Sequence, residues 1–260
     1  MIFDMKDAIS RLKKSLTQPE ISPVSSSRSL STQNSINANN FSNDFDDDLL
    51  PSVVLNGYLP TTKNRLLNSE MCGEIRMLMP TRIQLYTDWT LLYSLEQHGS
   101  SLSSLYECIS PESTTPVRVG YVIIIKDRMN GIFGAYSNEP FHPTDSRRYY
   151  GNGECFLWKL EKVPSVQIGK CSQPKENTVE NAVDCEWQFR GYPYTGLNEF
   201  AIYCTSKFLS MGGGDGHYGL WCDDSLLKGV SDPSLTYGND ILSPEGNKFH
   251  IVGLEVWRVG

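Results

Sequence analysis

The sequence lacks several features that would assign it to a common class of protein. No two of its cysteines lie closer than fourteen residues, so there is no CxxC pair. Structural zinc sites and thioredoxin-like redox sites both need two thiolates on one short loop. The longest unbroken apolar run covers only residues 121–125, whereas a membrane-spanning helix needs about 20 such residues. These absences argue against a zinc-stabilised domain, a dithiol oxidoreductase and a transmembrane protein.

Basic residues are also in the minority. Lys and Arg number 23 against 30 Asp and Glu, which gives a formal charge of −7. A chain of this charge repels phosphate backbones unless it carries a strong local basic patch, and the sequence contains no such cluster. We therefore expect no nucleic-acid partner.

The composition that is present is that of a soluble globular protein. Hydrophobic residues make up 39% of the 260 residues and aromatic residues 11%, enough for one domain with a sizeable core and a tail. The seven cysteines are an odd number, and no signal-peptide-like apolar segment lies near the N-terminus. We expect reduced thiols and a cytoplasmic protein.

Residues 1–16 predict a short amphipathic helix. Such a helix contacts a partner or a membrane surface, packs on its own domain, or stays unfolded in solution. A mitochondrial presequence is a further option, but Asp4 and Asp7 argue against it because such peptides avoid acidic residues. The apolar residues at helical spacing are Ile2, Met5, Ile9, Leu12 and Leu16.

Residues 17–50 differ sharply from the rest of the chain. Thirteen of these 34 residues are Ser or Asn, and the segment ends in an acidic run at 44–48. It cannot bury enough apolar area to offset its chain entropy, so we expect a disordered acidic linker. Residues 51–260 then form the folded domain.

The folded domain begins with helices and continues with strands. Ser69 is placed to cap a helix over 69–78. Asp88 is placed to cap a second helix over 89–97, which ends at Gly99. Ser101 begins a third helix over 101–108. Runs rich in β-branched and aromatic residues predict strands over 117–126, 132–136, 154–162, 186–190, 199–205, 218–222 and 250–258.

Two apolar segments indicate how the strands are layered. The Asn-Gly pair within 127–131 predicts an antiparallel hairpin between the first two strands. Residues 122–125 and 252–256 are apolar at nearly every position and need cover on both faces. We expect an α+β fold, mainly antiparallel, with two sheets and helices over an outer face. The polar segment 163–186 should be a surface loop.

The glycine cluster at 211–221 contains a literal GxGxxG from Gly214 to Gly219. A dinucleotide fingerprint needs a helix after it, whereas residues 220–222 look like a strand, and no Gly-Lys-Ser/Thr follows for a P-loop. We expect the glycines to permit positive φ and close backbone approach in a loop or bulge, and we expect no cofactor. A metal site is an open but weaker alternative; its ligands would be Asp215, His217, Asp223 and Asp224.

Two sets of residues could support catalysis. Cys204 with His217 and Asp223 has the residue types of a nucleophile, a base and an orienting acid, but Cys204 lies within an apolar strand. Two of the glutamates Glu154, Glu199 and Glu255 could act as a catalytic acid and base. We favour a structural role in which each carboxylate accepts hydrogen bonds from amides of the glycine loop. These three carboxylates are Glu154, Glu199 and Glu255.

Several longer motifs together carry a family resemblance. They are MPTRIQLYTDWTLLYSLEQHGSSLSSLY (79–106), GIFGAYSNEPF (131–141), GNGECFLWKL (151–160), LSMGGGDGHYGLWCDDSLLKGVS (209–231) and the terminal LEVWRVG. In this order they resemble the TLDc-domain family, most closely its fungal members concerned with oxidation resistance, from about residue 62 to the end. The resemblance implies a two-sheet β-sandwich flanked by helices.

The resemblance also implies a non-catalytic role. Family members bind the peripheral stalk and catalytic head of the cytosolic sector of the vacuolar proton-pumping ATPase and alter its assembly; protection from oxidants is downstream. The fungal pattern implies disassembly or inhibition, with recruitment from the cytoplasm to the vacuole surface. Because glycine loops let a partner backbone come close, the expected contact residues are Gly212, Gly213, Gly214, Asp215, Gly216 and His217.

Two alternatives remain beside pump binding. One is a peroxide-consuming or hydrolytic enzyme that uses Cys204 or a glutamate pair. The other is GTPase activation, because some animal relatives join this domain to a GTPase-activating one, but no such companion fits within this chain.

Overall fold

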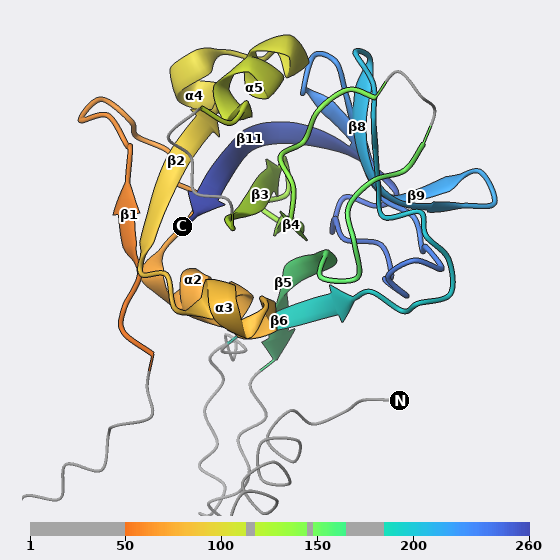
Figure 1. Ribbon diagram of the computed structural model, residues 1–260, viewed down its shortest axis with the longest axis horizontal. Coiled ribbons are helices and arrows are strands. Elements are labelled where there is room, and N and C mark those ends of the chain that lie inside the picture. The colour runs from red at the N-terminus through yellow and green to blue at the C-terminus, as the bar shows by residue number, and fades with distance from the viewer. Residues whose placement is uncertain (1–49, 113–117, 145–147, 165–184) are drawn as a thin grey trace, which may run out of the picture. The chain divides into compact units, whose positions relative to one another are not determined.

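The computed structural model describes residues 50–112, 118–144, 148–164 and 185–260 (Figure 1). The helix expected over 1–16, nearly all of the linker expected over 17–50 and the centre of the expected loop at 163–186 lie outside these ranges. The ends of that loop belong to strands, because Val163 pairs with Glu186 and Pro164 with Cys185.

The described residues contain four helices and eleven strands. The helices are α2 (Ser69–Leu78), α3 (Thr81–Gln84), α4 (Leu95–His98) and α5 (Leu102–Ile109). The strands are β1 (Val54–Asn56), β2 (Asp88–Ser94), β3 (Gly120–Asp127), β4 (Ile132–Ser137), β5 (Phe156–Pro164), β6 (Cys185–Pro193), β7 (Ile202–Cys204), β8 (Phe208–Gly214), β9 (His217–Asp223), β10 (Lys228–Val230) and β11 (Lys248–Val259). None of these helices is long and apolar enough to cross a bilayer.

The strands form a mainly antiparallel sandwich of two sheets that share β11, which confirms the expected fold class (Figure 1). Sheet A has the order β6-β5-β4-β3-β11-β2-β1, and sheet B the order β11-β10-β9-β8-β7. The start of β11, through His250, pairs with β10, and from Ile251 onward it pairs with β3. A register shift between Ile251 and Gly253 marks the change, as bulges do where a strand turns from one sheet into another.

Strand β3 shows why both faces of sheet A are covered. Ile123 and Ile125 join the core between the two sheets, while Val122 and Ile124 join a second core on the outer face, beneath α2 and α3. The expectation of cover on both faces is therefore confirmed for 122–125. It is wrong at Val252, which is exposed because it lies at the register shift of β11.

The helix starts and stops agree largely with the sequence signals. The side chain of Asn68, one residue before the expected cap, accepts a hydrogen bond from Met71 N at 2.9 Å and begins α2. Ser101 caps α5 by accepting from Ser104 N at 3.3 Å. The β3–β4 hairpin is also confirmed, with Asn130 at φ 63° in its turn.

The helix expected over 89–97 is wrong for most of its length. Residues 88–94 form β2, in which Trp89, Leu91 and Tyr93 are buried at alternate positions and β11 supplies the hydrogen bonds. The residues between them are half-buried. Because some of these are apolar as well, the alternation of buried and exposed positions that marks a strand was not evident, and the apolar residues also fit a helical spacing. Only α4 remains helical, and Gly99 at φ 80° ends it as expected.

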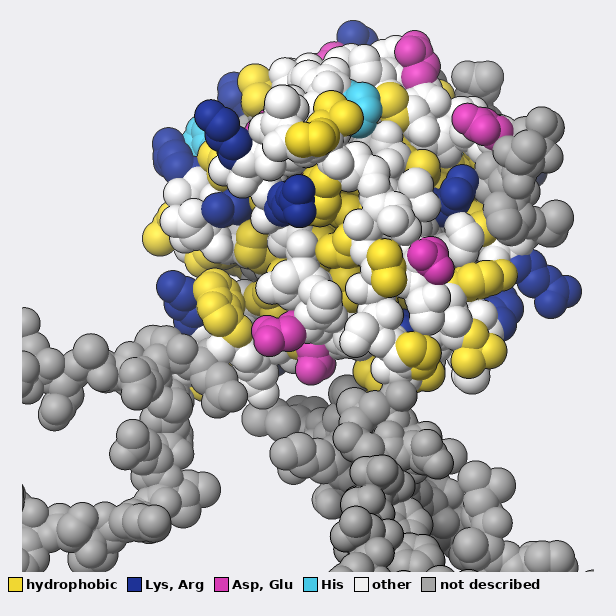
Figure 2. Space-filling model, turned by 90° about the vertical axis from the view of Figure 1, so that its left-hand side faces the viewer, with side chains coloured by type: hydrophobic (Ala, Val, Ile, Leu, Met, Phe, Trp, Pro, Cys, Tyr) yellow, Lys and Arg dark blue, Asp and Glu magenta, His cyan; other side chains and the backbone are white. Residues whose placement is uncertain are grey.

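The side of the molecule that carries β1 and β2 has charged groups of both signs. Figure 2 shows Lys and Arg side chains there as separate groups among apolar and acidic ones.

Gly134 in β4 tests the close packing of sheet A. A Cβ at this position would lie 1.9 Å from the carbonyl oxygen of Ile123, so Gly134→Ala must displace a central strand. We expect it to lower the free energy of unfolding by about 3 kcal/mol, measured by urea denaturation. Gly73→Ala in α2 is the control: its Cβ meets nothing within 4 Å, and we expect a gain of about 1 kcal/mol. Equal effects at both sites would contradict the described packing.

Candidate functional site

The glycine cluster forms a hairpin rather than a loop. Residues expected to form a loop belong to β8, which pairs with β9 from Phe208↔Asp223 to Gly214↔His217. Asp215 and Gly216, at φ 52° and 79°, make the two-residue turn, as a type I′ hairpin requires. The GxGxxG therefore leads into a strand, and no helix N-terminus is available for a phosphate.

The glycines of this hairpin allow close packing, as expected. Gly212 has φ 69°, and a Cβ there would lie 2.8 Å from both Ser234 Oγ and the ring of Tyr237. A Cβ at Gly213 would lie 2.7 Å from the Tyr149 hydroxyl. Both glycines are buried, so a partner can reach only the end of the hairpin, Gly214–His217.

The end of the hairpin is held from two neighbouring loops. The side chain of Asn198 donates to the carbonyl oxygen of Gly213 at 3.4 Å, and Thr236 Oγ1 donates to Asn198 Oδ1 at 2.8 Å. Gly213 N in turn donates to Thr236 Oγ1 at 3.2 Å. This network fixes the loops around 195–200 and 233–238 beside the hairpin.

These loops expose large apolar side chains next to the hairpin. Leu197 is 71% exposed and Leu235 55%, and Phe200 lies 3.8 Å from the Cβ position of Gly214. His217 has a side chain 59% exposed, with Nδ1 3.6 Å from Asp232 Oδ2. We call this area the tip surface and define it as Gly214–His217 with Leu197, Phe200 and Leu235. These three apolar residues were not predicted from the sequence, where their only signal was a large apolar side chain in a loop that contains glycine and asparagine.

The residues considered as metal ligands do not come together. Asp215 and His217 lie at one end of β9, and Asp223 and Asp224 at the other, roughly 20 Å away at about 3.3 Å per strand residue. Asp223 caps a turn instead, because its Oδ1 accepts from Leu227 N at 3.0 Å. No group of three or more His, Cys, Asp and Glu suited to a metal occurs in the described ranges.

Cys204 is also separated from the residues that would activate it. It lies fully buried in β7, across β8 from the Asp223 end of β9 and far from His217. Burial raises the pKa of its thiol to about 11, so the thiol stays protonated near neutral pH. The structure places it as a packing group between the sheets.

The three glutamates have separate environments, and the expected hydrogen bonds from the glycine loop are not their contacts. Glu154 pairs with Arg82, whose Nη1 lies 2.6 Å from Oε1, and the hydrogen bonds from Arg82 lower the pKa of this carboxyl. Glu199 is exposed in the loop before β7. Among the described residues, no hydrogen-bond partner is shared by two of the three carboxylates.

Glu255 is buried in β11 and joins distant parts of the chain. Its carboxylate accepts hydrogen bonds from the Tyr58 hydroxyl at 2.9 and 3.0 Å, from Leu66 N at 3.1 Å and from Trp257 Nε1 at 2.9 Å. Burial raises the pKa of this carboxyl, and the hydrogen bonds oppose that rise without cancelling it. Glu255 therefore pins the segment before α2 to the last strand.

Cysteine labelling tests the burial of Cys204. We expect iodoacetamide to modify half-buried Cys108 in the native protein and to reach Cys204 only after unfolding, because a buried, protonated thiol is a poor nucleophile. Peptide mass spectrometry after timed quenching gives both rates. Native labelling of Cys204 as fast as that of Cys108 would contradict its assignment to the core.

The pH dependence of stability tests Glu255. The pKa of Glu255 is higher in the folded protein than in the unfolded chain, where it is near 4.5. Protonation of Glu255 therefore stabilises the fold fully below about pH 4.5, and this stabilisation is lost as the pH rises through the folded-state pKa. We expect the free energy of unfolding of the wild type, relative to Glu255→Gln, to fall as the pH rises above about 4.5, as measured by urea denaturation. Glu74→Gln, at an exposed site in α2, reports the charge change alone. A relative stability that rises over this range would contradict the assignment.

Comparison with known proteins identifies the family of the chain. The family model of the TLDc domain matches residues 60–260. A protein named Oxidation resistance protein 1 from Kluyveromyces lactis is 64% identical over 232 residues, covering 88% of each chain. Proteins of the same name from Saccharomyces cerevisiae and Candida glabrata are 58% and 55% identical, with 100% of both chains covered. The chain therefore belongs to the TLDc-domain family.

Proposed function

We propose that this chain binds the cytosolic sector of the vacuolar proton-pumping ATPase and favours its disassembly or inhibition. Resistance to oxidants then follows from altered organelle acidity. Family membership over 60–260 and the name shared by the fungal relatives support a role in oxidation resistance. The pump as partner comes from the resemblance of the sequence motifs to pump-binding members of the family.

The observation that carries a binding role is the tip surface. It combines exposed Leu197 and Leu235 with an imidazole and a hairpin end held by Asn198. Adjacent exposed large apolar groups with polar neighbours are typical of protein interaction sites. Because the network of Asn198 and Thr236 orders this surface before binding, little conformational entropy is lost on association.

Binding alone is sufficient to change assembly. If the chain binds the separated cytosolic sector more tightly than the assembled pump, the equilibrium shifts by the ratio of the two affinities. No covalent step is needed, which agrees with the protonated thiol of Cys204 and the separately partnered glutamates. The protein would act from the cytoplasm and be recruited to the vacuole surface by this contact.

A charge introduced at the tip surface tests the contact. We expect His217→Glu to weaken binding to the purified cytosolic sector by roughly fivefold or more, about 1 kcal/mol, because it places a carboxylate beside Asp232 in the proposed interface. Biolayer interferometry with the full-length chain measures the affinity.

Met129→Glu is the matched control. It adds one negative charge at another hairpin end, where Met129 is 60% exposed, and we expect the affinity to stay within twofold. Equal losses in both variants would remove the tip surface from the contact. Absence of binding by the wild type, together with turnover of peroxide by the purified chain, would favour the enzyme alternative.

A further inference from the structure

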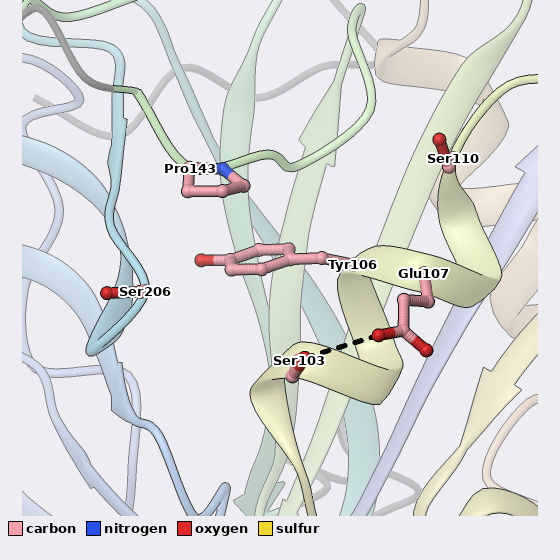
Figure 3. Close-up of a pocket in the computed structure, with 6 residues that line it drawn as sticks. All are labelled: Ser103, Tyr106, Glu107, Ser110, Pro143 and Ser206. Atoms are coloured by element: carbon pink, nitrogen blue, oxygen red, sulfur yellow. Dashed lines mark hydrogen bonds between the residues drawn. The ribbon is translucent and has the colours of Figure 1, made fainter.

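A hollow of about 450 Å³ lies between α5 and two loops from distant parts of the chain. Figure 3 shows the ring of Tyr106 extending from α5 toward the loop that carries Ser206, beside Pro143. The hollow and the tip surface lie at opposite ends of β8, because Ser206 precedes this strand and the hairpin turn follows it. The lining residues are Ser103, Tyr106, Glu107, Ser110, Pro143 and Ser206.

The walls of this hollow are fixed by hydrogen bonds. The hydroxyl of Tyr106 lies 3.0 Å from the carbonyl oxygen of Thr205 and 3.2 Å from that of Phe208, and it donates to them. Burial raises the pKa of this hydroxyl far above its ordinary value, so it remains a donor. Thr144 N donates to the carbonyl oxygen of Cys204 at 3.0 Å and fixes the loop that carries Pro143. The hollow is therefore formed before any ligand arrives.

The lining combines the rings of Tyr106 and Pro143 with one carboxylate, that of Glu107. Tyr106 and Pro143 provide apolar surface, and Glu107 stands at the rim in the last turn of α5. Its carboxylate accepts a hydrogen bond from Ser103 Oγ at 3.4 Å, and no Lys or Arg pairs with it in the part of the chain that the structure describes. The carbonyl groups at the C-terminal end of α5 add to the negative potential.

This lining selects against anions and favours a cation on an aliphatic stem. Among the residues that the structure describes, no basic side chain lines the hollow, and nearby Lys207 is directed to Asp224, with Nζ 3.3 Å from Oδ2. A guanidinium stacks on aromatic rings and meets a carboxylate with two parallel hydrogen bonds, which an ammonium cannot do. The chain's net charge of −7 favours approach of a basic segment.

We propose that this hollow binds an arginine side chain presented by a partner protein, with the stem against Tyr106 and Pro143 and the guanidinium on Glu107. The site goes beyond the pump contact assigned to the tip surface, and its test contains no pump subunit. Failure of one proposal therefore leaves the other standing.

The test uses the full-length chain and N-acetyl-arginine amide as the probe. Titration followed by ¹H–¹⁵N correlation spectra should give saturable shifts centred on residues 103–110 and 205–207. Glu107→Gln should weaken binding roughly two- to fivefold, the range for an exposed ion pair, while leaving the rest of the spectrum unchanged. Glu74→Gln, on exposed α2, is the charge-matched control and should bind as the wild type does.

Two further probes decide the chemistry. N-acetyl-citrulline amide keeps the shape of arginine without its charge and should bind at least twofold more weakly than arginine, and N-acetyl-lysine amide should also bind more weakly than arginine. Shifts that do not saturate, equal binding of citrulline, or unchanged affinity in Glu107→Gln would overturn the proposal. Equal binding of lysine would overturn the preference for arginine.

Discussion

Strand β11 is the element on which both sheets depend. Sheet B is joined to sheet A by strand pairing through this strand, whose first residues pair with β10 and whose remainder lies between β3 and β2. Leu254 and Val256 face the core between the sheets, while Trp257 and Val259 face the outer core. The position of the tip surface relative to the helices therefore follows from the path of one strand.

Glu255 adds a polar constraint to this strand. An isolated buried carboxylate is costly, and Tyr58, Trp257 and the amide of Leu66 offset that cost with hydrogen bonds. Because Tyr58 and Leu66 precede the first described helix, the carboxylate links the beginning of the folded body to its end. This contact holds the segment before α2 on the outer face of sheet A, together with the apolar packing of the outer core.

Elements were predicted correctly from the sequence where the local pattern of caps, turn residues and apolar runs favours the same structure as the packing does. The β3–β4 turn, α2, α5 and the doubly covered strand β3 carried caps, turn residues or runs that packing did not override. Strand β2 was missed because Leu92, which is half-buried, is apolar like the buried residues on either side of it. The apolar residues of this segment therefore matched the spacing of a helix as well as the alternation of a strand. Strand β8 was missed because its glycines were expected to lie in a loop or a bulge.

The sites were less predictable than the strands. The exposure of Gly214–His217 and the burial of Gly212 depend on where Ser234 and Tyr237 lie, which no local pattern reveals. The hollow beside Tyr106 joins α5 to Pro143 and Ser206, residues brought together only by folding. Short-range signals in the chain could not have indicated either surface.

The most direct test of the proposed role is to measure whether the chain binds the separated cytosolic sector more tightly than the assembled pump. Affinities of the purified chain for the isolated cytosolic sector and for the assembled pump in vesicles should differ by about tenfold or more in favour of the isolated sector, since only a difference in affinity can shift assembly. Equal affinities, or no binding to either form, would contradict a role in biasing pump assembly.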